Sequence, residues 1–526
     1  MQKSKINRIE TGLFSIISNR LSYQQNSLQK YIETPFSETA FQTQIDKKKN
    51  QFTKEKRVEL VNALEHQYKK LNVNNEVISN IKLLEKDTTF TVTTGHQLSI
   101  FTGPIYFIYK ILHVIKLTQE LKSKNPENDF VPLFWLASED HDFEEIQSVP
   151  IFGNSIKWET DQKGPVGRFD FSSFEQIKSS FLSFFKQSES EVYALIDNYY
   201  KGETLGEATL NLVNHLFQEY GLVIVDGDNL ILKNSFKEIA KREITTAFSH
   251  TAVTITNQEL EAEGVKTQVY PREINLFYIE DNFRERIQLI EDEYYIEGKG
   301  TYSQVEILQL IEDQPEKFSP NVVLRPLYQE FILPNLCYVG GGGEMAYWLQ
   351  LKGVFDSFGC VYPLIQVRNS LLHIDASSQK KIDNLHLTIN DLFLKSNDLK
   401  KKYVLKYSSN ELNFKDIDAS VNLFSDNLKK LVYQIDIGLS SYAEAEIARF
   451  NKQVENIQQK LIKTEKVKHE QYLNQIDQIK EKLFPNEGVQ ERKMNFFNLC
   501  ANGEVKSHIQ TIYRAIDPFE NDLIIY

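Results

Sequence analysis

Residues 138–145 place five carboxylates and one imidazole within eight positions, in the order Ser-Glu-Asp-His-Asp-Phe-Glu-Glu. Carboxylates at this density are costly to hold together unless a cation, an amine or a proton is shared among them. The candidate catalytic residues are therefore Glu139, Asp140, His141 and Asp142. We expect His141 or Asp140 to act as general base on an attacking amine, or the group to bind Mg²⁺ or a substrate ammonium. The alternative is a solvated acidic loop that caps a helix beginning near Phe143.

A second block, residues 93–110, runs from a β-branched stretch through a glycine-bearing loop into an apolar helical stretch. Pro104 suits a first helical turn and Thr102 can cap it, so the free N–H groups of that turn could bind a carboxylate or phosphate. The candidates for contact with this anion are His96, Gln97, Thr102, Gly103 and Lys110. The alternative is an ordinary capped helix after a turn glycine.

The third block, residues 319–348, contains Arg325 at the end of a predicted strand and four consecutive glycines before a predicted helix. Glycines let the backbone approach a ligand closely, and the planar guanidinium of Arg325 suits a carboxylate or phosphate. The ligand-binding candidates here are Arg325, Gly340, Gly341, Gly342 and Gly343. Neither GxxxxGK[ST] nor GxGxxG occurs, and the glycine run alone is also compatible with a flexible loop.

Weaker candidates are the segment 226–228 (Asp-Gly-Asp) and three arginines of the middle region, Arg272, Arg284 and Arg286. Such residues more often form turns and surface charges than sites. The chain has only three cysteines, Cys337, Cys360 and Cys500, without a CxxC pair. This count fits a reducing compartment and buried thiols better than disulfides or a catalytic nucleophile.

Composition excludes several classes of protein. Hydrophobic residues are 41% and charged residues 25% of the 526, as in ordinary globular proteins. The 60 Lys and Arg against 72 Asp and Glu give a net charge of -12, which disfavours a nucleic-acid partner. The apolar stretches are too short to cross a bilayer and the polar start lacks a signal-peptide core, so we expect a cytoplasmic protein.

The elements that must position these blocks form a βαβ unit: a strand at 88–94, a helix at 104–121 and a buried strand at 131–137. Further strands are predicted at 221–226, 322–325 and 360–365, each near a helical segment. This alternation predicts an α/β fold with an open parallel sheet, in which ligands bind beyond the carboxyl ends of the strands.

Four regions follow from these patterns. They are an N-terminal helical segment (1–85) packing on the core, an α/β core (86–375) with an insertion at about 227–315, a helical coiled-coil domain (376–490) and a C-terminal segment (491–526) returning to the core. In the third region, apolar residues repeat every three or four positions in 382–392 and in 447–483, and the second stretch is interrupted by an eleven-residue gap from Leu461 to Tyr472, as a stutter in a heptad pattern produces. We expect these two arms, joined by a less regular stretch at 403–440, to fold back as an antiparallel hairpin with a structural or dimer-forming role.

Together the three blocks resemble the cysteine-adding enzymes of bacillithiol biosynthesis. The resemblance rests on residues 94–97 (Thr-Gly-His-Gln), 101–104 (Phe-Thr-Gly-Pro), 109–110 (Tyr-Lys), 134–135 (Phe-Trp), 139–145, 319–326 and 340–348. It implies a Rossmann-like core, a C-terminal coiled-coil domain and a homodimer. It also makes Tyr106, Trp135, Glu344 and Tyr347 substrate-binding candidates. Two positions depart from the family pattern, since glutamine is common in place of His96 and proline in place of Gly342.

The implied reaction is a ligase reaction that joins the carboxyl of cysteine to the free amine of glucosaminyl malate. Because amide formation in water needs an activated carboxyl, fold-level analogy suggests ATP or another nucleotide, with Mg²⁺ as a further open question. No residue is assigned here as a resident metal ligand. Two alternatives stay open, namely another amide-forming or nucleotidyl-transfer ligase on the same core, and a non-enzymatic coiled-coil scaffold.

Overall fold

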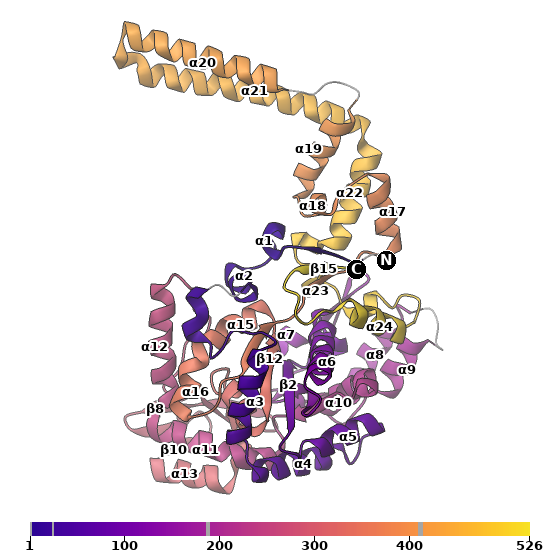
Figure 1. The fold of residues 1–526 in the computed structure, drawn as a ribbon, viewed down its shortest axis with the longest axis vertical. Coiled ribbons are helices and arrows are strands. Elements are labelled where there is room, and N and C mark those ends of the chain that lie inside the picture. The colour runs from indigo at the N-terminus through magenta and orange to yellow at the C-terminus, as the bar shows by residue number, and fades with distance from the viewer. Residues whose placement is uncertain (1–2, 24–25, 186–189, 409–413) are drawn as a thin grey trace. The chain divides into compact units, whose positions relative to one another are not determined.

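The computed structural model describes residues 3–23, 26–185, 190–408 and 414–526 (Figure 1). The chain divides into two compact units. The core unit comprises Met1–Leu372 and Glu491–Tyr526, and the helical unit comprises His373–Gln490. None of the helices within the described ranges combines the length and the apolar character that crossing a membrane requires.

A five-stranded parallel sheet forms the centre of the core unit, with the order β13-β12-β2-β3-β6. Its strands are β2 (Thr89–His96), β3 (Asp129–Leu136), β6 (Val223–Asp226), β12 (Asn335–Gly340) and β13 (Leu364–Val367). Every residue of β12 and β13 is buried, as expected for a parallel sheet with both faces covered. The predicted α/β fold with a parallel sheet is confirmed.

Helix α6 (Tyr106–Lys124) connects β2 to β3 and packs on both strands, which confirms the predicted βαβ unit. Its buried face is almost wholly apolar, so it covers the sheet rather than facing water. The helices before β2 are α1 (Arg8–Thr11), α2 (Ile16–Ser22), α3 (Ala40–Gln51), α4 (Lys54–Tyr68) and α5 (Asn75–Leu83). Of these, α3 packs on β12 and β13.

The predicted strand at 322–325 is wrong. The side chain of Asn321 accepts hydrogen bonds from the backbone N–H groups of Val323 (2.8 Å) and Leu324 (3.4 Å), which turns the chain into helix α14 (Arg325–Ile332). Arg325 therefore begins a helix instead of ending a strand. The strand at 335–340 was not predicted, because Pro334 and the glycine run at its two ends resemble a loop.

The predicted insertion contains a separate five-stranded antiparallel sheet, in the order β10-β9-β8-β7-β11. The strands are β7 (Leu276–Glu280), β8 (Phe283–Ile290), β9 (Glu293–Ile296), β10 (Gly300–Tyr302) and β11 (Phe318–Pro320). The helices of this region are α11 (Leu230–Thr246), α12 (Phe248–Ala262) and α13 (Gln304–Asp313). Between β3 and β6 lie α7 (Phe143–Ile146), β4 (Ser148–Ile151), β5 (Asn154–Lys157), α8 (Glu175–Leu182), α9 (Glu191–Asn198) and α10 (Leu205–Phe217).

The last residues of the chain belong to the core unit. Strand β15 (Leu523–Ile525) pairs with β1 (Ser4–Ile6) and β14 (Leu371–Leu372), and α24 (Lys506–Ala515) contacts α6. Arg368 binds Glu491 through two hydrogen bonds of 2.9 and 2.7 Å, both buried. Helices α15 (Gly342–Trp348), α16 (Lys352–Phe358) and α23 (Gln490–Lys493) complete this part of the fold.

The helical unit differs from the predicted hairpin in which segments pair. Its helices are α17 (Ala376–Asn384), α18 (Ile389–Leu392), α19 (Ser396–Tyr407), α20 (Lys415–Ile435), α21 (Ser440–Lys468) and α22 (Glu470–Leu483). The two-helix hairpin consists of α20 and α21, so the stretch predicted to be less regular contains a 21-residue helix (Figure 1). The predicted first arm forms short helices, of which α17 and α19 pack on α22. The eleven-residue gap in the apolar pattern coincides with the break between α21 and α22 at His469.

Candidate functional site

A cavity of about 900 Å³ opens at the carboxyl ends of β2 and β3, between the parallel sheet and the inserted antiparallel sheet. All three sequence blocks contribute to its lining. The predicted residues that line it are His96, Gln97, Tyr106, Lys110, Trp135, Glu139, Asp140, His141, Arg325, Gly343, Glu344 and Tyr347. Segments that lie more than 200 positions apart in the sequence thus converge at the edge where parallel sheets bind ligands.

Six predicted site residues do not line this cavity: Thr102, Gly103, Asp142, Gly340, Gly341 and Gly342. Thr102 does not cap α6, whose first turn has no side-chain cap. Instead the N–H of Ile105 donates to the carbonyl of Met494 at 2.7 Å, and the side-chain amide of Asn495 donates to the carbonyls of Phe101 and Gly103. The C-terminal segment thus packs at this helix start, and the Met494 carbonyl takes one of the N–H groups to which an anion was predicted to bind.

The glycine run opens α15 as predicted, and two of its residues, Gly340 and Gly342, face the chain's own side chains, whereas Gly341 and Gly343 face open space. A side chain at Gly342 would collide with Ser18, and one at Gly340 would collide with Met345 and Glu344. The carboxylate of Glu344 also accepts the N–H of Gly341 at 3.2 Å. A negative charge already occupies the start of this short helix, so the loop does not fit a phosphate.

Lys110 and Glu344 form a buried ion pair in the wall of the cavity. The Lys110 Nζ to Glu344 Oε2 distance is 2.6 Å, and Lys110 also donates to the carbonyl of Gly95 at 2.9 Å. The hydroxyl of Tyr338 donates to the other oxygen of Glu344. Burial would raise the pKa of Glu344, but the adjacent Lys110 charge lowers it below its ordinary value. The pair is therefore ionised and compensated, and Lys110 is not a free cation in this structure.

The acidic residues of the block at 138–145 differ in their partners. Glu139 pairs with Lys233 of α11, which also donates to the carbonyl of Phe318 at 2.6 Å. Burial and the nearby Asp228 charge raise the pKa of Glu139, although Lys233 opposes the shift. Asp142 is exposed and has no side-chain hydrogen bond to α7, so neither its predicted catalytic place nor a capping role is seen.

Asp140 and His141 face the cavity with different partners. Gln97 donates to Asp140 at 3.1 Å, and Arg284 donates to Nδ1 of His141 at 2.6 Å. Burial would raise the pKa of Asp140, but hydrogen bonds from the backbone N–H of His141 (2.7 Å) and from Gln97, together with the charge of Arg284, lower it well below its ordinary value. Asp140 is therefore ionised and too weakly basic to be the better general base of the two.

Four arginines face the cavity, namely Arg272, Arg284, Arg286 and Arg325. Within the described parts of the chain, none of them lies within 4.0 Å of a carboxylate oxygen. Three come from the insertion, where sequence reasoning favoured surface charges. Their shared position in the cavity, which results from the fold of the insertion, distinguishes them from surface charges. The sequence signal that could have found two of them is the i, i+2 spacing of Arg284 and Arg286, which places both side chains on one face of β8.

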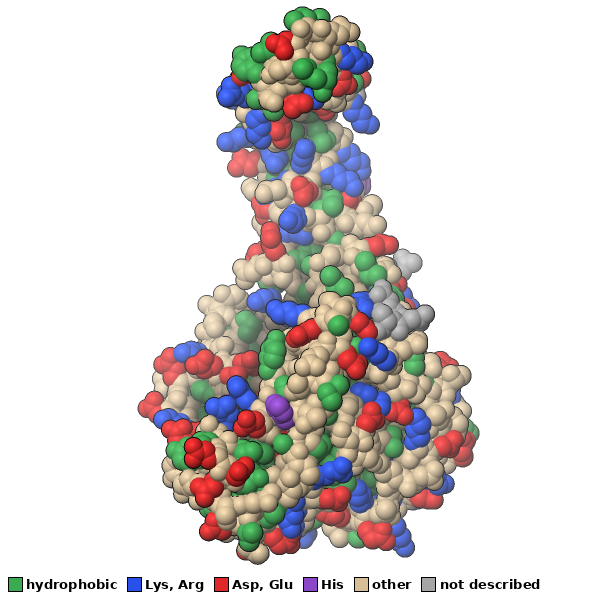
Figure 2. All heavy atoms as spheres, turned by 90° about the vertical axis from the view of Figure 1, so that its left-hand side faces the viewer, with side chains coloured by type: hydrophobic (Ala, Val, Ile, Leu, Met, Phe, Trp, Pro, Cys, Tyr) green, Lys and Arg blue, Asp and Glu red, His purple; other side chains and the backbone are tan. Residues whose placement is uncertain are grey.

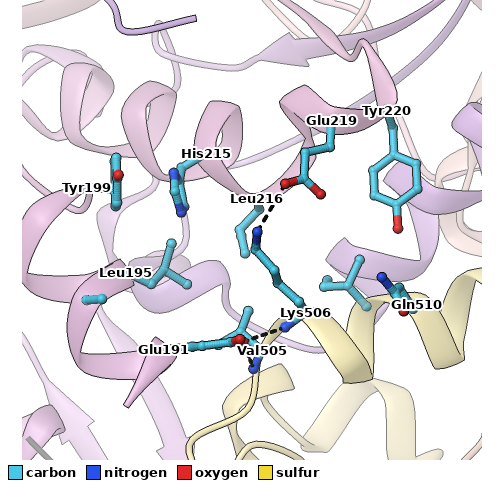
Figure 3. Close-up of a pocket in the computed structure, with 12 residues that line it drawn as sticks. Glu191, Leu195, Tyr199, His215, Leu216, Glu219, Tyr220, Val505, Lys506 and Gln510 are labelled. Atoms are coloured by element: carbon cyan, nitrogen blue, oxygen red, sulfur yellow. Dashed lines mark hydrogen bonds and ion pairs between the residues drawn. The ribbon is translucent and has the colours of Figure 1, made fainter. Parts of the chain in front are cut away.

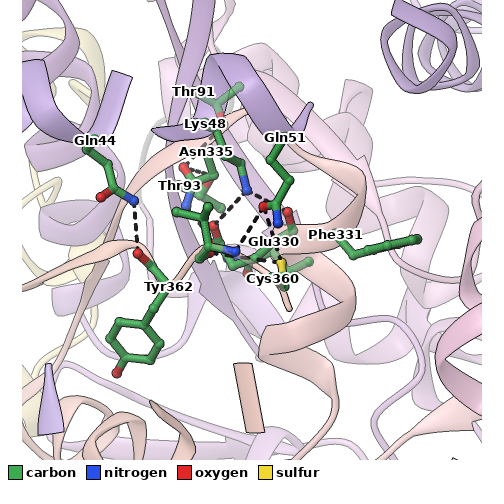
Figure 4. A network of polar contacts seen from close by, with 12 residues as sticks. Gln44, Lys48, Gln51, Thr91, Thr93, Glu330, Phe331, Asn335, Cys360 and Tyr362 are labelled. Atoms are coloured by element: carbon green, nitrogen blue, oxygen red, sulfur yellow. Dashed lines mark hydrogen bonds and ion pairs between the residues drawn. The ribbon is translucent and has the colours of Figure 1, made fainter. Parts of the chain in front are cut away.

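Arg325 is held by a chain of hydrogen bonds that continues into the core. Figure 4 shows the inner part of this chain, at Glu330 and Asn335. Its guanidinium donates to Gln329 Oε1 at 3.1 Å and to the Tyr347 hydroxyl at 3.4 Å. The Gln329 amide donates to Glu330, which also accepts from Asn335 at 2.7 Å. Burial raises the pKa of Glu330 to about 7, while Lys48 opposes the shift. This network limits the orientations open to Arg325.

His96 lies at the end of β2 against the rings of Tyr106 and Phe107. Burial and the nearby Lys110 charge lower its pKa to about 3. The Nε2 atom is buried and has no hydrogen-bond partner among the described residues. His96 is therefore a neutral ring at physiological pH, suited to hydrogen bonding with a ligand rather than to acid catalysis.

Comparison with known proteins decides the family. The model of the N-terminal Rossmann-like domain of bacillithiol biosynthesis BshC matches residues 1–369, and that of its C-terminal coiled-coil domain matches residues 371–526. The chain belongs to the BshC family. It is 42% identical to a BshC protein of Flavobacterium johnsoniae over 92% of each chain, and 40% identical to that of Flavobacterium psychrophilum over 93% and 92%. A relative from Christiangramia forsetii is 36% identical over 98% and 97% of the two chains.

Membership of the BshC family confirms the resemblance, the Rossmann-like core and the helical C-terminal domain. The three relatives are named as cysteine ligases. Among the residues that the structure describes, no three His, Cys, Asp or Glu side chains are arranged to hold a metal ion. The alternative Mg²⁺ role of Asp140, His141 and Asp142 stays a prediction for this BshC chain, because Mg²⁺ can bind through one or two carboxylates and substrate oxygens.

A second cavity of about 290 Å³ lies between α9, α10 and α24 (Figure 3). Lys506 at its mouth is paired with Glu219 at 3.0 Å, and Glu191 accepts the N–H groups of Val505 and Lys506. Most of its remaining lining is aliphatic or aromatic. Since its charges are already paired and it contains none of the three blocks, the larger cavity is the better candidate for the BshC active site.

Proposed function

We propose that the protein is a cysteine ligase that joins the carboxyl of L-cysteine to the free amine of glucosaminyl malate, giving bacillithiol. The observation that carries the proposal is the set of uncompensated arginines in one cavity. Arg284 and Arg325 are half-buried and Arg272 and Arg286 are exposed, and cations that share one cavity without carboxylate partners favour anionic ligands. Glucosaminyl malate brings two carboxylates and cysteine brings one, so both proposed substrates match the charge of the site.

In this proposal Arg325 holds a substrate carboxylate. Its guanidinium is planar and is oriented by Gln329 and Tyr347, so it can bind two carboxylate oxygens with little loss of freedom. The neutral His96 supplies one further hydrogen bond. The Lys110–Glu344 pair sets the shape and polarity of the wall between them.

His141 is the proposed general base for the sugar amine. Asp140 lies beside it, with 3.7 Å between Asp140 Oδ1 and His141 Nδ1, and can stabilise the imidazolium that forms when the ring takes a proton. Of the other carboxylates that line the cavity here, Glu139 is neutralised by Lys233 and Glu145 accepts a hydrogen bond from Gln97 at 2.8 Å. In this assignment the imidazole of His141 takes the proton, and the carboxylate of Asp140 stabilises the positive charge of the resulting imidazolium.

Activation of the cysteine carboxyl by ATP or another nucleotide, with or without Mg²⁺, stays a proposal. The two helix starts expected to hold phosphates are the weaker candidates for this role, because the Met494 carbonyl takes the Ile105 N–H at one and the Glu344 carboxylate accepts the Gly341 N–H at the other. We therefore derive no step through a nucleotide. The arginines of the insertion are the remaining candidates for phosphate binding, and they can be tested separately from the ligase reaction.

We also propose that the protein is a homodimer formed through the α20–α21 hairpin. Large apolar side chains with exposed fractions of 40–73% follow the same seven-and-four spacing on both helices: Phe424, Leu431, Ile435, Phe450, Ile457 and Leu461. Figure 2 shows hydrophobic side chains at the surface of this unit. The rings of Phe424 and Phe450 lie 5.6 Å apart, so the two rows meet. A second hairpin with the same rows could cover them.

The deciding experiment mixes purified protein with glucosaminyl malate and cysteine, with and without ATP and Mg²⁺, and detects bacillithiol by mass spectrometry. Formation of bacillithiol would support the proposed ligase reaction. Dependence of this product on ATP would indicate that a nucleotide activates the cysteine carboxyl. Folded protein that forms no product, yet forms another amide from related amines, would favour a ligase with different substrates. Folded protein without any amide-forming activity would favour the scaffold alternative.

A further inference from the structure

The contact between Arg284 and His141 restricts what the imidazole can do. Arg284 lies on β8 of the insertion, and its Nη1 is 2.6 Å from Nδ1 of His141. Its guanidinium carbon also lies 3.6 Å from the centre of the Phe277 ring, and this cation–π contact stabilises the position of the Arg284 side chain. Among the residues that the structure describes, Asp140, Arg284 and the Phe277 ring lie against this imidazole, and the charges of Asp140 and Glu139 both act on Arg284.

The protonation of the His141 ring follows from the chemistry of its partner. A guanidinium has only donors and does not release a proton at physiological pH, so Nδ1 must accept the hydrogen bond. A neutral imidazole that accepts at Nδ1 carries its proton on Nε2. In this arrangement Nδ1 is occupied and Nε2 is protonated, and neither ring nitrogen can accept a proton from a substrate amine.

We propose that Arg284 is a latch on His141 that a substrate carboxylate opens, an inference that rests on the proposed ligase function. A carboxylate offers Arg284 two charge-assisted hydrogen bonds, which are stronger than the single bond to a neutral imidazole. When Arg284 turns to this carboxylate, Nδ1 is released. The ring then exchanges its proton with water, so that Nδ1 carries it and donates to Asp140.

The open latch makes His141 competent as a base. With Nδ1–H donating to Asp140, Nε2 has a free lone pair and can take one proton from the attacking ammonium group. The ring becomes an imidazolium between the amine and the ionised Asp140, and no proton is created or lost. The base is thus available only when a carboxylate-bearing substrate is bound, which makes Arg284 a specificity-determining residue.

The test reads the tautomer directly. Protein labelled with ¹⁵N at histidine is titrated with L-malate, and the His141 signal is assigned with a His141→Gln variant. We expect Nε2–H in the wild type without ligand and Nδ1–H when L-malate is bound. In Arg284→Gln we expect Nδ1–H in both states. Wild-type protein with Nδ1–H in the absence of ligand, or an Nε2–H ring that saturating bound malate leaves unchanged, would overturn the latch.

The matched control is Arg286→Gln, which removes a cavity arginine of the same strand that does not contact the imidazole. We expect it to weaken malate binding while leaving the ring as Nε2–H without ligand. Both variants should raise the KM for glucosaminyl malate by about 10–100-fold. The tautomer result does not depend on turnover, so absence of bacillithiol formation would reject the proposed function while leaving the latch to be judged by the spectra.

Discussion

Lys110 and Glu344 are 234 positions apart in the sequence, yet their charged groups are 2.6 Å apart in the wall of the cavity. Their side chains are 6% and 18% exposed, so neither charge is well solvated by water. The pair connects the first helix after β2 to the helix after the glycine run. Its integrity is therefore a condition both for the fold and for the shape of the site.

The Lys110→Met substitution should destabilise the core unit by about 3–5 kcal/mol, because it leaves the Glu344 carboxylate buried without its cation. Adding Glu344→Gln should restore part of that loss. Urea denaturation followed by tryptophan fluorescence measures the effect, since all three tryptophans belong to the core unit. A double variant less stable than Lys110→Met would show that charge compensation is not the reason.

The Arg325→Lys substitution should raise the KM for glucosaminyl malate by about 10–100-fold, because a lysine cannot reproduce a planar two-point contact with a carboxylate. Steady-state kinetics of bacillithiol formation measures this. The matched control is Arg449→Lys in the helical unit, where the arginine pairs with Glu446 on an exposed surface. Equal effects of the two substitutions would rule out a special role for Arg325.

His96→Gln should mainly raise KM and leave the pH profile of kcat unchanged. The reason is that the pKa of His96 is lowered to about 3, so the ring does not change charge between pH 5 and 9. The measurement is kcat and KM as functions of pH for both proteins. Loss of an ionisation from the kcat profile of the variant would contradict a purely binding role.

Asp226 should make the protein less stable as pH rises from about 4 to 7. Poor solvation and the neighbouring Asp228 charge raise its pKa to about 7, so in this window the folded protein keeps a proton that the unfolded chain, with a pKa of about 3.9, has released. The limit for one such group is about 1.4 kcal/mol per pH unit.

Asp226→Asn should remove this contribution. Thermal unfolding measured at several pH values should show a smaller loss of stability between pH 5 and 7 for the variant than for the wild type. Glu330, whose pKa is also raised to about 7, is present in both proteins and cancels in the difference. Parallel curves for the two proteins would mean that Asp226 titrates normally.

Leu431→Glu and Ile457→Glu should each dissociate the proposed dimer, because a charge would then lie in the apolar rows of α20 and α21. Sedimentation velocity gives the oligomeric state. The matched control is Lys452→Glu, an exposed change on α21 away from these rows. A monomeric wild type, or dimers that survive both substitutions, would reject the hairpin as the interface.

Local patterns in the sequence were sufficient for the parallel core. Continuous apolar runs such as 131–137 belong to strands that are buried on both faces, and the polar blocks that follow them lie at the carboxyl ends because parallel strands share that edge. The same patterns misassigned 322–325 as a strand, because the side chain of Asn321 directs a turn there. They also missed strand β12, because the proline before it and the glycines after it are typical of a loop.

Only the tertiary structure decided which charged and polar side chains contact one another. The sequence by itself determined the fold family, the blocks and the chemistry that each block could supply. It did not reveal that Glu344 compensates the charge of Lys110, that Asn495 binds the carbonyl of Gly103 at the helix start near Thr102, or that Arg284 contacts His141. Local periodicity depends on neighbours a few positions apart, whereas a charge out of contact with water must find its partner wherever the topology places one.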